Sequence, residues 1–147
     1  MIWIIAILTL LAGTLLPVQA GINSKLGVMV WHPVRAAFIS FLVGLVFLLL
    51  YVIFIRKPWP TPSEIKRFPW WIWTGGILGA VYVIASILFA PRLGAAVFIS
   101  LVVTGQMVAS ILLDHYGLVG FSIRTVTPLR ILGVFLLIGG VILIRLF

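Results

Sequence analysis

Cysteine and acidic side chains are the scarcest chemical groups in this 147-residue chain. There is no cysteine, and Glu64 and Asp114 are the only carboxylates. The absence of cysteine excludes disulfide bonds, thiolate metal sites and cysteine nucleophiles. No acid pair, metal-ligand cluster, nucleophile motif or phosphate-binding loop occurs, and His32 and His115 lie far apart in the sequence. We therefore expect a protein that is not an enzyme and that uses no metal or cofactor.

A long polar segment is also missing. Charged residues make up 8% of the chain and hydrophobic residues 64%, a balance far outside the range of a soluble domain. The longest polar stretch runs only from Arg56 to Phe68. The net charge of +8 does not indicate nucleic acid binding, because the ten Lys and Arg residues are scattered at helix ends, where they anchor to lipid headgroups.

Apolar runs are what the sequence has in abundance. There are five, each of about 18 to 22 residues, which is enough to cross a bilayer core of about 30 Å as a helix. The first run lacks a basic start and is longer than a signal-peptide core, so we expect it to be retained. The pattern predicts an all-α membrane protein with a single five-helix transmembrane domain over residues 1–147. The predicted helices are Ile2–Ile22, Val34–Ile55, Trp70–Ala90, Ala95–Leu113 and Leu129–Phe147.

An odd number of spanning helices places the two termini on opposite sides of the membrane. A chain this small is also too short to enclose a solute pathway comfortably, so we expect the working unit to contain more than one copy. Charge counting gives only a weak orientation bias. Insertion in both orientations and ordinary insertion with the N-terminus inside therefore both stay open. The basic residues on the N-terminal side are Arg56, Lys57, Lys66, Arg67, Arg124 and Arg130, against Lys25, Arg35, Arg92 and Arg145 on the other.

Glycine, proline and short polar residues mark the breaks between the helices. The break between the first two helices is predicted at Asn23, Gly27, His32 and Pro33. Residues 91–94, Pro-Arg-Leu-Gly, predict a very tight turn that makes the third and fourth helices an antiparallel hairpin. Residues 63–68 are interpreted as a short interfacial turn.

Polar side chains within the apolar runs are the candidates for function, because they are costly in a bilayer and usually face protein or water. In the first helix, Pro17 removes the hydrogen bond to the carbonyl of Gly13. Gln19 and Asn23 follow one turn apart. We interpret this kink, free carbonyl and pair of amides as one wall of a binding site.

Two later helices carry polar residues at four-residue steps, which place side chains on one face. The alternative role of such groups is hydrogen bonding between helices as structural glue. That alternative is favoured for a lone hydroxyl, whereas both roles stay open for the amides. The predicted substrate-binding residues are Gln19, Asn23, Tyr82, Ser86, Gln106 and Ser110.

The two carboxylates receive different interpretations. Glu64 lies beside Lys66 and Arg67, which predicts a solvated ion pair. Asp114 follows the fourth apolar run and could cap that helix, pair with a basic loop residue or relay a proton; we favour pairing or anchoring. The residues assigned structural or gating roles are Pro17, Arg92 and Asp114.

Several short segments together resemble the short YdcZ-type, EamA-like proteins of the drug/metabolite transporter superfamily. They cover almost the whole chain in the expected order. The segments are QAGIN at 19–23, SFLVG at 40–44, GGILGA at 75–80, APRLGAA at 90–96, and GQMVAS at 105–110 with Asp114 and His115.

The resemblance implies a multi-pass protein of the bacterial cytoplasmic (inner) membrane that is half of an inverted-repeat transporter. Larger members of the superfamily contain ten helices as two inverted five-helix repeats. A five-helix chain then needs an antiparallel partner, either a second copy in a homodimer or a paired paralogue. The short multidrug exporters of the superfamily use a buried glutamate in the first helix. This sequence has no acid there, so their cation/proton exchange cannot be carried over.

Together these observations predict an exporter of a small metabolite or drug-like solute that works by alternating access. Its site is expected at the dimer centre, walled by the first, third and fourth helices. A neutral or weakly anionic solute is expected over a quaternary ammonium compound, because the spanning helices offer no central carboxylate. Two alternatives stay open: a dual-topology channel and a non-transporting membrane assembly partner.

Overall fold

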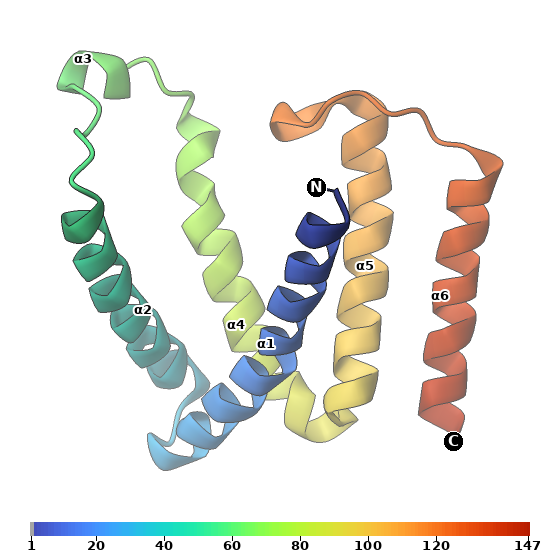
Figure 1. Cartoon of the computed structure of the whole chain (residues 1–147). Coiled ribbons are helices and arrows are strands. Elements are labelled where there is room, and N and C mark those ends of the chain that lie inside the picture. Colours follow the sequence, from blue (N-terminus) through green and yellow to red (C-terminus); the bar gives the residue numbers. More distant parts are fainter. Residues whose placement is uncertain (1) are drawn as a thin grey trace. The chain divides into compact units, whose positions relative to one another are not determined.

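Five long apolar helices dominate the computed structural model, which describes residues 2–147 (Figure 1). Each is long and apolar enough to cross a membrane, judged by length and composition. Residues 2–147 contain no strand, so the all-α class and the five membrane-spanning helices are confirmed. The helices are α1 (Ile2–Met29), α2 (Pro33–Ile55), α4 (Gly75–Leu93), α5 (Ala95–Tyr116) and α6 (Pro128–Leu146), with a short α3 (Pro62–Ile65) and 3₁₀ turns at Trp70–Thr74 and Leu118–Gly120.

The break between the first two helices was predicted at four residues, and two of them are wrong. Asn23 and Gly27 lie inside α1, which continues to Met29. The break falls at Trp31, whose φ is +58°, and at His32, whose Nδ1 accepts a hydrogen bond from the N–H of Val34. Gly27 packs closely against Ile87 of α4, a contact that a sequence pattern does not show.

The predicted turn at residues 91–94 is also shorter than expected. Pro91, Arg92 and Leu93 form the last turn of α4, and only Gly94 interrupts the helix before α5 begins. Gly94 has φ +82°, a left-handed conformation that L side chains rarely adopt. The antiparallel hairpin of α4 and α5 stays a prediction.

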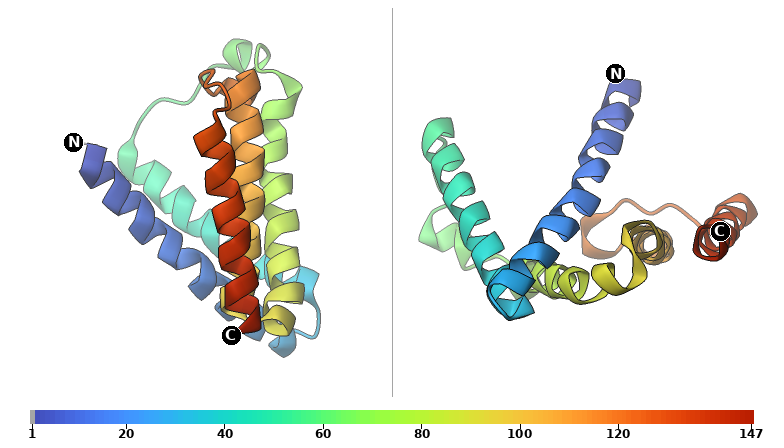
Figure 2. Two further views of the ribbon diagram at one scale, coloured as in Figure 1. Left: turned by 90° about the vertical axis from the view of Figure 1, so that its right-hand side faces the viewer. Right: turned by 90° about the horizontal axis from the view of Figure 1, so that it is seen from below.

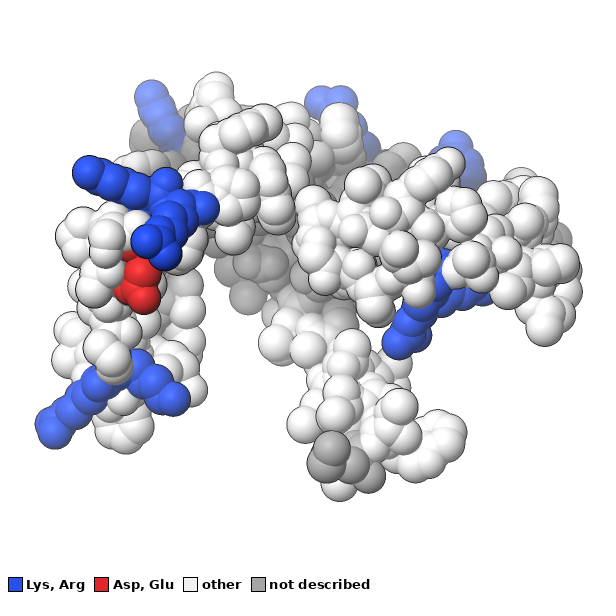
Figure 3. Space-filling model, turned by 90° about the horizontal axis from the view of Figure 1, so that it is seen from above, with Lys and Arg blue, Asp and Glu red and all other residues white. Residues whose placement is uncertain are grey.

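In the connection after α2, Glu64 caps a helical turn and does not form the predicted ion pair. The predicted turn begins with the helical turn α3, closed by a capping box: Glu64 Oε2 accepts from the Thr61 N–H at 2.7 Å, and Thr61 Oγ1 accepts from the Glu64 N–H at 3.4 Å. No ion pair of Glu64 occurs within residues 2–147. Hydrogen bonds from the side chain and backbone of Thr61 hold the pKa of Glu64 below its ordinary value. On the face of the molecule that Figure 3 shows, acidic atoms form one small patch with Lys and Arg atoms beside it.

The described chain divides into two compact units. The chain passes from one unit to the other at two places, and at each of them a proline lies inside a helix. One unit joins the start of α1, up to Pro17, to residues Arg92–Phe147, and the other is Val18–Pro91. Pro17 lies within α1 and Pro91 within α4. Neither proline has an N–H, so each leaves one carbonyl of the preceding turn without its helical donor. The single five-helix domain stays a prediction.

In the Val18–Pro91 unit, small residues bring α1, α2 and α4 together. The core consists of Ala36, Ala37, Val83 and Ile87, with Leu26, Val30, Tyr82 and Ile84 packed against it. A Cβ placed on Gly27 of α1 would lie 2.8 Å from Cγ2 of Ile87 in α4. Glycine is therefore required for this close approach, which is the usual way in which membrane helices gain packing contacts.

In the other unit, α5 and α6 lie side by side and are joined by residues 117–127, as both Figures 1 and 2 show. Gly117 ends α5 in the left-handed conformation. Thr127 caps α6, where its Oγ1 accepts a hydrogen bond from the N–H of Arg130 at 3.3 Å, and Pro128 occupies the first helical position.

The helix surfaces are apolar and largely uncovered. Within residues 2–147 no large side chain is fully buried, and Phe47 and Phe54 are 68% and 81% exposed. A soluble protein rarely exposes such extended apolar surface. Apolar surface of this extent is expected of helices that lie in a membrane.

Candidate functional site

Asn23 is the most deeply buried of the predicted site residues on α1. It is 3% exposed and shares a helix face with Ala20 and Gly27, which are also buried. Gly27 lies one turn further along and approaches Ile87, so this face is directed toward α4. The Nδ2 atom of Asn23 has no hydrogen-bond partner in the described chain. A buried donor without an acceptor costs about 1–3 kcal/mol, so this position favours a bound acceptor atom.

Tyr82 and Ser86 of α4 belong to the same unit as Asn23. Tyr82 packs against the core, and its hydroxyl is shielded and unpaired within residues 2–147. Ser86 is 2% exposed, but its hydroxyl donates to the carbonyl of Val83 at 2.7 Å. Its proton is therefore already used inside α4, as is common for helical serines. Asn23 and Tyr82 are left with spare donors, whereas Ser86 can only accept.

Gln19 lies in a different environment from Asn23. Its side chain is exposed and lines a groove of about 320 Å³ against α2, together with Ser40, Phe41 and Gly44. Asn23 by contrast is buried, so the two amides do not form the common wall suggested by their spacing. Pro17 lies two residues before Gln19 in the same helix.

Gln106 and Ser110 occupy α5, in the second unit. Both are exposed in the single chain. Gln106 stands near the middle of α5 and makes no hydrogen bond to any described residue. Ser110, one turn on, lines the groove between α5 and α6 beside Asp114 and Arg130. This amide halfway along an apolar helix thus has no hydrogen-bond partner among residues 2–147.

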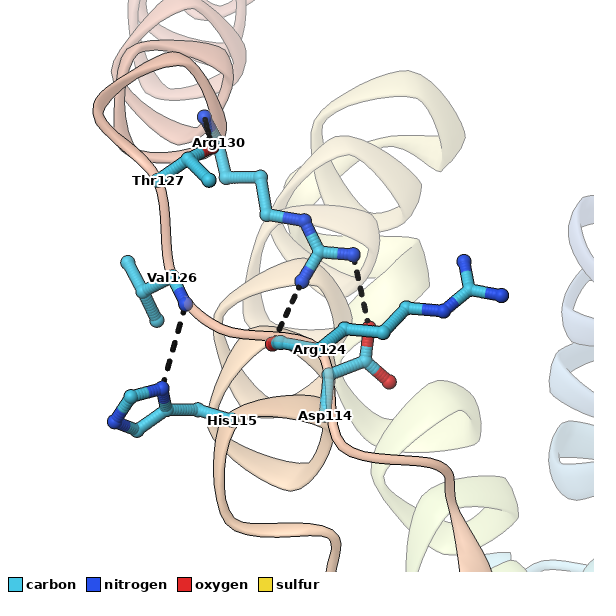
Figure 4. Close-up of polar contacts among 6 residues, drawn as sticks. All are labelled: Asp114, His115, Arg124, Val126, Thr127 and Arg130. Carbon is cyan, nitrogen blue, oxygen red and sulfur yellow. Dashed lines mark hydrogen bonds and ion pairs between the residues drawn. The ribbon is translucent and has the colours of Figure 1, made fainter.

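Asp114 forms the ion pair that was expected for it, and its partner is Arg130 of α6. The Nη2 atom of Arg130 lies 3.2 Å from Oδ2 of Asp114. The Nη1 atom of Arg130 donates to the carbonyl of Arg124 at 3.2 Å (Figure 4). The Arg124 N–H donates to the carbonyl of Asp114 at 2.8 Å. These contacts tie the end of α5, the connecting loop and the start of α6 together.

His115 strengthens the same junction, a role that we did not predict. Its Nδ1 accepts a hydrogen bond from the N–H of Val126 at 3.3 Å (Figure 4). The partners of Asp114 and His115 are 16 and 11 residues away in the chain, so no helical or strand period relates them. The adjacent Asp-His pair at a helix end was the only available signal.

Arg92 lies exposed in the last turn of α4, where a cation interacts favourably with the helix dipole. No group of three or more metal-binding side chains occurs in the part of the chain that the structure describes. The polar groups that are present can donate and accept hydrogen bonds along apolar helices. They are therefore suited to recognising a solute.

Comparison with known proteins agrees with this chemistry. The family model described as "Putative inner membrane exporter, YdcZ", of the DMT type, matches residues 4–143 and so includes most or all of each spanning helix. No curated protein and no solved structure matches the chain.

Proposed function

The chain belongs to the YdcZ family of inner membrane exporters, and from that premise we propose that it carries a small solute by alternating access as an antiparallel homodimer. The family and the five apolar helices make it a multi-pass inner-membrane protein. The family description is that of a transporter rather than an enzyme. Substrate, mechanism and assembly are the parts that we propose.

One observation supports the assembly most directly: the exposed amide of Gln106 near the middle of α5. Transferring an amide to an apolar medium without a hydrogen bond costs roughly 2–7 kcal/mol. Gln106 therefore needs a polar partner beside it, from the Val18–Pro91 unit, a second chain, a water-filled pathway or a solute. A second, inverted copy would supply both a partner surface and a pathway, and the odd number of spanning helices suits that arrangement.

The spare hydrogen-bonding groups favour a solute that carries acceptor atoms. Asn23 Nδ2 and the Tyr82 hydroxyl are buried donors without acceptors in the described chain. The one carboxylate in the spanning helices, Asp114, is already paired with Arg130 at the end of its helix. A bare cation would lack a counter-charge there and would pay a desolvation cost of several kcal/mol. We therefore propose a neutral or weakly anionic solute.

The two helix prolines suggest how the protein changes between its inward-open and outward-open forms. The chain passes between its units at Pro17 and Pro91 and nowhere else in residues 2–147. Kinks at proline are common because the missing hydrogen bond weakens the helix at that point. We propose that bending at these two positions accompanies transport, with Arg92 directly beside the second hinge.

The test is flux by the purified protein alone in liposomes, with a panel of matched neutral, anionic and cationic solutes. For a transported solute, Gln106→Leu keeps the side-chain volume but removes the amide. We expect flux to fall about tenfold or more, because losing a hydrogen bond and leaving its partner unpaired costs about 1–3 kcal/mol. Leu112→Met is the matched control, since Leu112 is an exposed apolar residue of the same helix.

The outcomes separate the proposal from its rivals. Normal flux in Gln106→Leu would mean that this amide only packs against another helix. Single-channel currents would identify a dual-topology channel instead of a carrier. No flux of any solute by the purified wild-type protein would favour a non-transporting assembly partner, and transport of lipophilic cations alone would overturn the proposed substrate class.

A further inference from the structure

We propose that the groove between α5 and α6 binds one anionic phospholipid, with an acyl chain along the helices and the phosphate at Arg124 and Arg130. This proposal does not depend on the transported solute. The groove is lined by residues of α5 and α6, whereas the buried donors of Asn23 and Tyr82 belong to the Val18–Pro91 unit.

The groove has room for a chain because α6 carries glycine where it faces α5. Two hollows of about 400 and 270 Å³ lie between these helices, and both are lined by Gly133 and Leu137, so they adjoin. A Cβ placed on Gly133 or on Gly140 would meet no atom within 4 Å. The helices therefore leave a space along their contact that their own side chains do not fill.

The middle of the groove offers no free hydrogen-bond donor to a polar ligand. Apart from Ser100 and Thr104, the larger hollow is lined by apolar side chains and by Gly133 and Gly140. The Ser100 hydroxyl donates to the carbonyl of Ala96 at 2.7 Å, and that of Thr104 donates to the carbonyl of Ser100 at 2.9 Å. Both protons are used within α5, so hydrocarbon suits this space better than a sugar or a peptide.

Among the residues that line the groove, the charged ones lie at one end. Asp114 and Arg130 line the smaller hollow as an ion pair. Arg124 adds a second guanidinium, which extends past that pair (Figure 4) and has no hydrogen bond or ion pair within residues 2–147. Two arginines and one aspartate leave a net positive charge, which complements the single negative charge of a phosphodiester headgroup. Arginine also matches phosphate oxygens in geometry.

The charged end also lies at the right depth for a headgroup. α5 ends at Tyr116 and α6 begins at Pro128, and basic side chains at the ends of spanning helices usually lie at the membrane interface. From Arg130 to Gly140, α6 rises about 15 Å, half of a bilayer core of about 30 Å. The groove beneath the arginines is thus about one leaflet deep. Basic pockets between spanning helices are a general form of anionic-lipid site.

The experiment is native mass spectrometry of the purified full-length protein incubated with phosphatidylglycerol or with phosphatidylcholine. We expect one retained phosphatidylglycerol, at about tenfold higher occupancy than phosphatidylcholine. Arg124→Gln should lower that occupancy about tenfold, which corresponds to losing one charge-assisted hydrogen bond. The Arg124 side chain makes no contact that holds the fold, because its hydrogen bonds come from its backbone.

Two further variants separate the groove from general charge effects. Arg145→Gln removes one charge at the other end of α6 and should leave lipid retention unchanged. Gly140→Leu fills the groove and should reduce retention of both lipids while every charge remains. Equal retention of the two lipids, or an equal loss in Arg145→Gln, would overturn the proposal.

Two remaining outcomes identify a different occupant. Displacement of the lipid by inorganic phosphate, but not by another salt at the same ionic strength, would indicate a free-anion site. Cysteine crosslinking that joins the groove positions Gly133 and Gly140 of one copy to a second copy would mean that a helix, not lipid, fills the space. Either result would refute the lipid assignment.

Discussion

Replacing Gly27 by alanine tests the packing that positions Asn23. The added Cβ would lie 2.8 Å from Cγ2 of Ile87, closer than a real Cβ atom approaches a neighbouring heavy atom. Ile87 is 6% exposed, and a β-branched side chain has few alternative rotamers, so it cannot move aside easily. The helices α1 and α4 must separate instead. Overpacking of this kind costs about 1–3 kcal/mol.

The matched control is Gly21→Ala on the same helix, where a Cβ would meet no atom within 4 Å. Both variants gain up to about 1 kcal/mol of helix propensity, so their difference isolates the packing cost. We expect Gly27→Ala to be less stable than Gly21→Ala by about 1–3 kcal/mol. The assay is unfolding in mixed micelles by SDS titration, followed by tryptophan fluorescence.

A double-mutant cycle identifies the atom responsible. Ile87→Ala removes Cγ2, so the cost of Gly27→Ala should largely disappear in that background, with a coupling energy of about 1–3 kcal/mol. Equal stability of Gly27→Ala and Gly21→Ala, or no coupling with Ile87, would refute the close approach of α1 and α4. The same shift would displace Asn23, so solute flux in Gly27→Ala should fall more than in Gly21→Ala.

Three further predictions concern the ion pair, the α3 cap and topology. Asp114→Asn should lower the free energy of unfolding by less than about 1 kcal/mol, because its pair with Arg130 is partly exposed, and should leave the pH dependence of transport unchanged; loss of proton coupling in a folded variant would contradict this role. Because the pKa of Glu64 is lowered in the folded protein, its contribution to the α3 cap is complete at neutral pH and is lost as pH falls through that lowered pKa. Hydrogen exchange corrected for intrinsic rates should show acid-induced loss of α3 protection in the wild type and none in Glu64→Gln. A C-terminal tag should be reached from both sides of the membrane, whereas a single orientation with parallel crosslinked dimers would refute the antiparallel assembly.

The membrane class could be derived from the composition and from the length of the apolar runs, because both depend on the thickness of the bilayer and not on tertiary contacts. A stretch of apolar residues either is or is not long enough to span about 30 Å, whatever its neighbours are. The predicted starts at Val34 and Leu129 each fall one residue after the proline that begins α2 or α6, because the apolar runs themselves begin there. Proline at the first helical position is a local signal that would have supplied the missing residue. The capping box of Thr61 and Glu64 was equally local; charge proximity to Lys66 and Arg67 misled the interpretation of Glu64.

Packing and long-range pairing required the folded chain. Asn23 and Gly27 resemble helix-breaking residues in isolation, but α1 continues through both of them and Gly27 packs against Ile87. Four-residue spacing grouped Gln19 with Asn23, but one faces the α2 groove and the other is buried. The partners of Asp114 and His115 lie outside any helical period. Residue types and periods predict which side chains can carry function, whereas their partners depend on where other helices pack, and that is decided by tertiary structure.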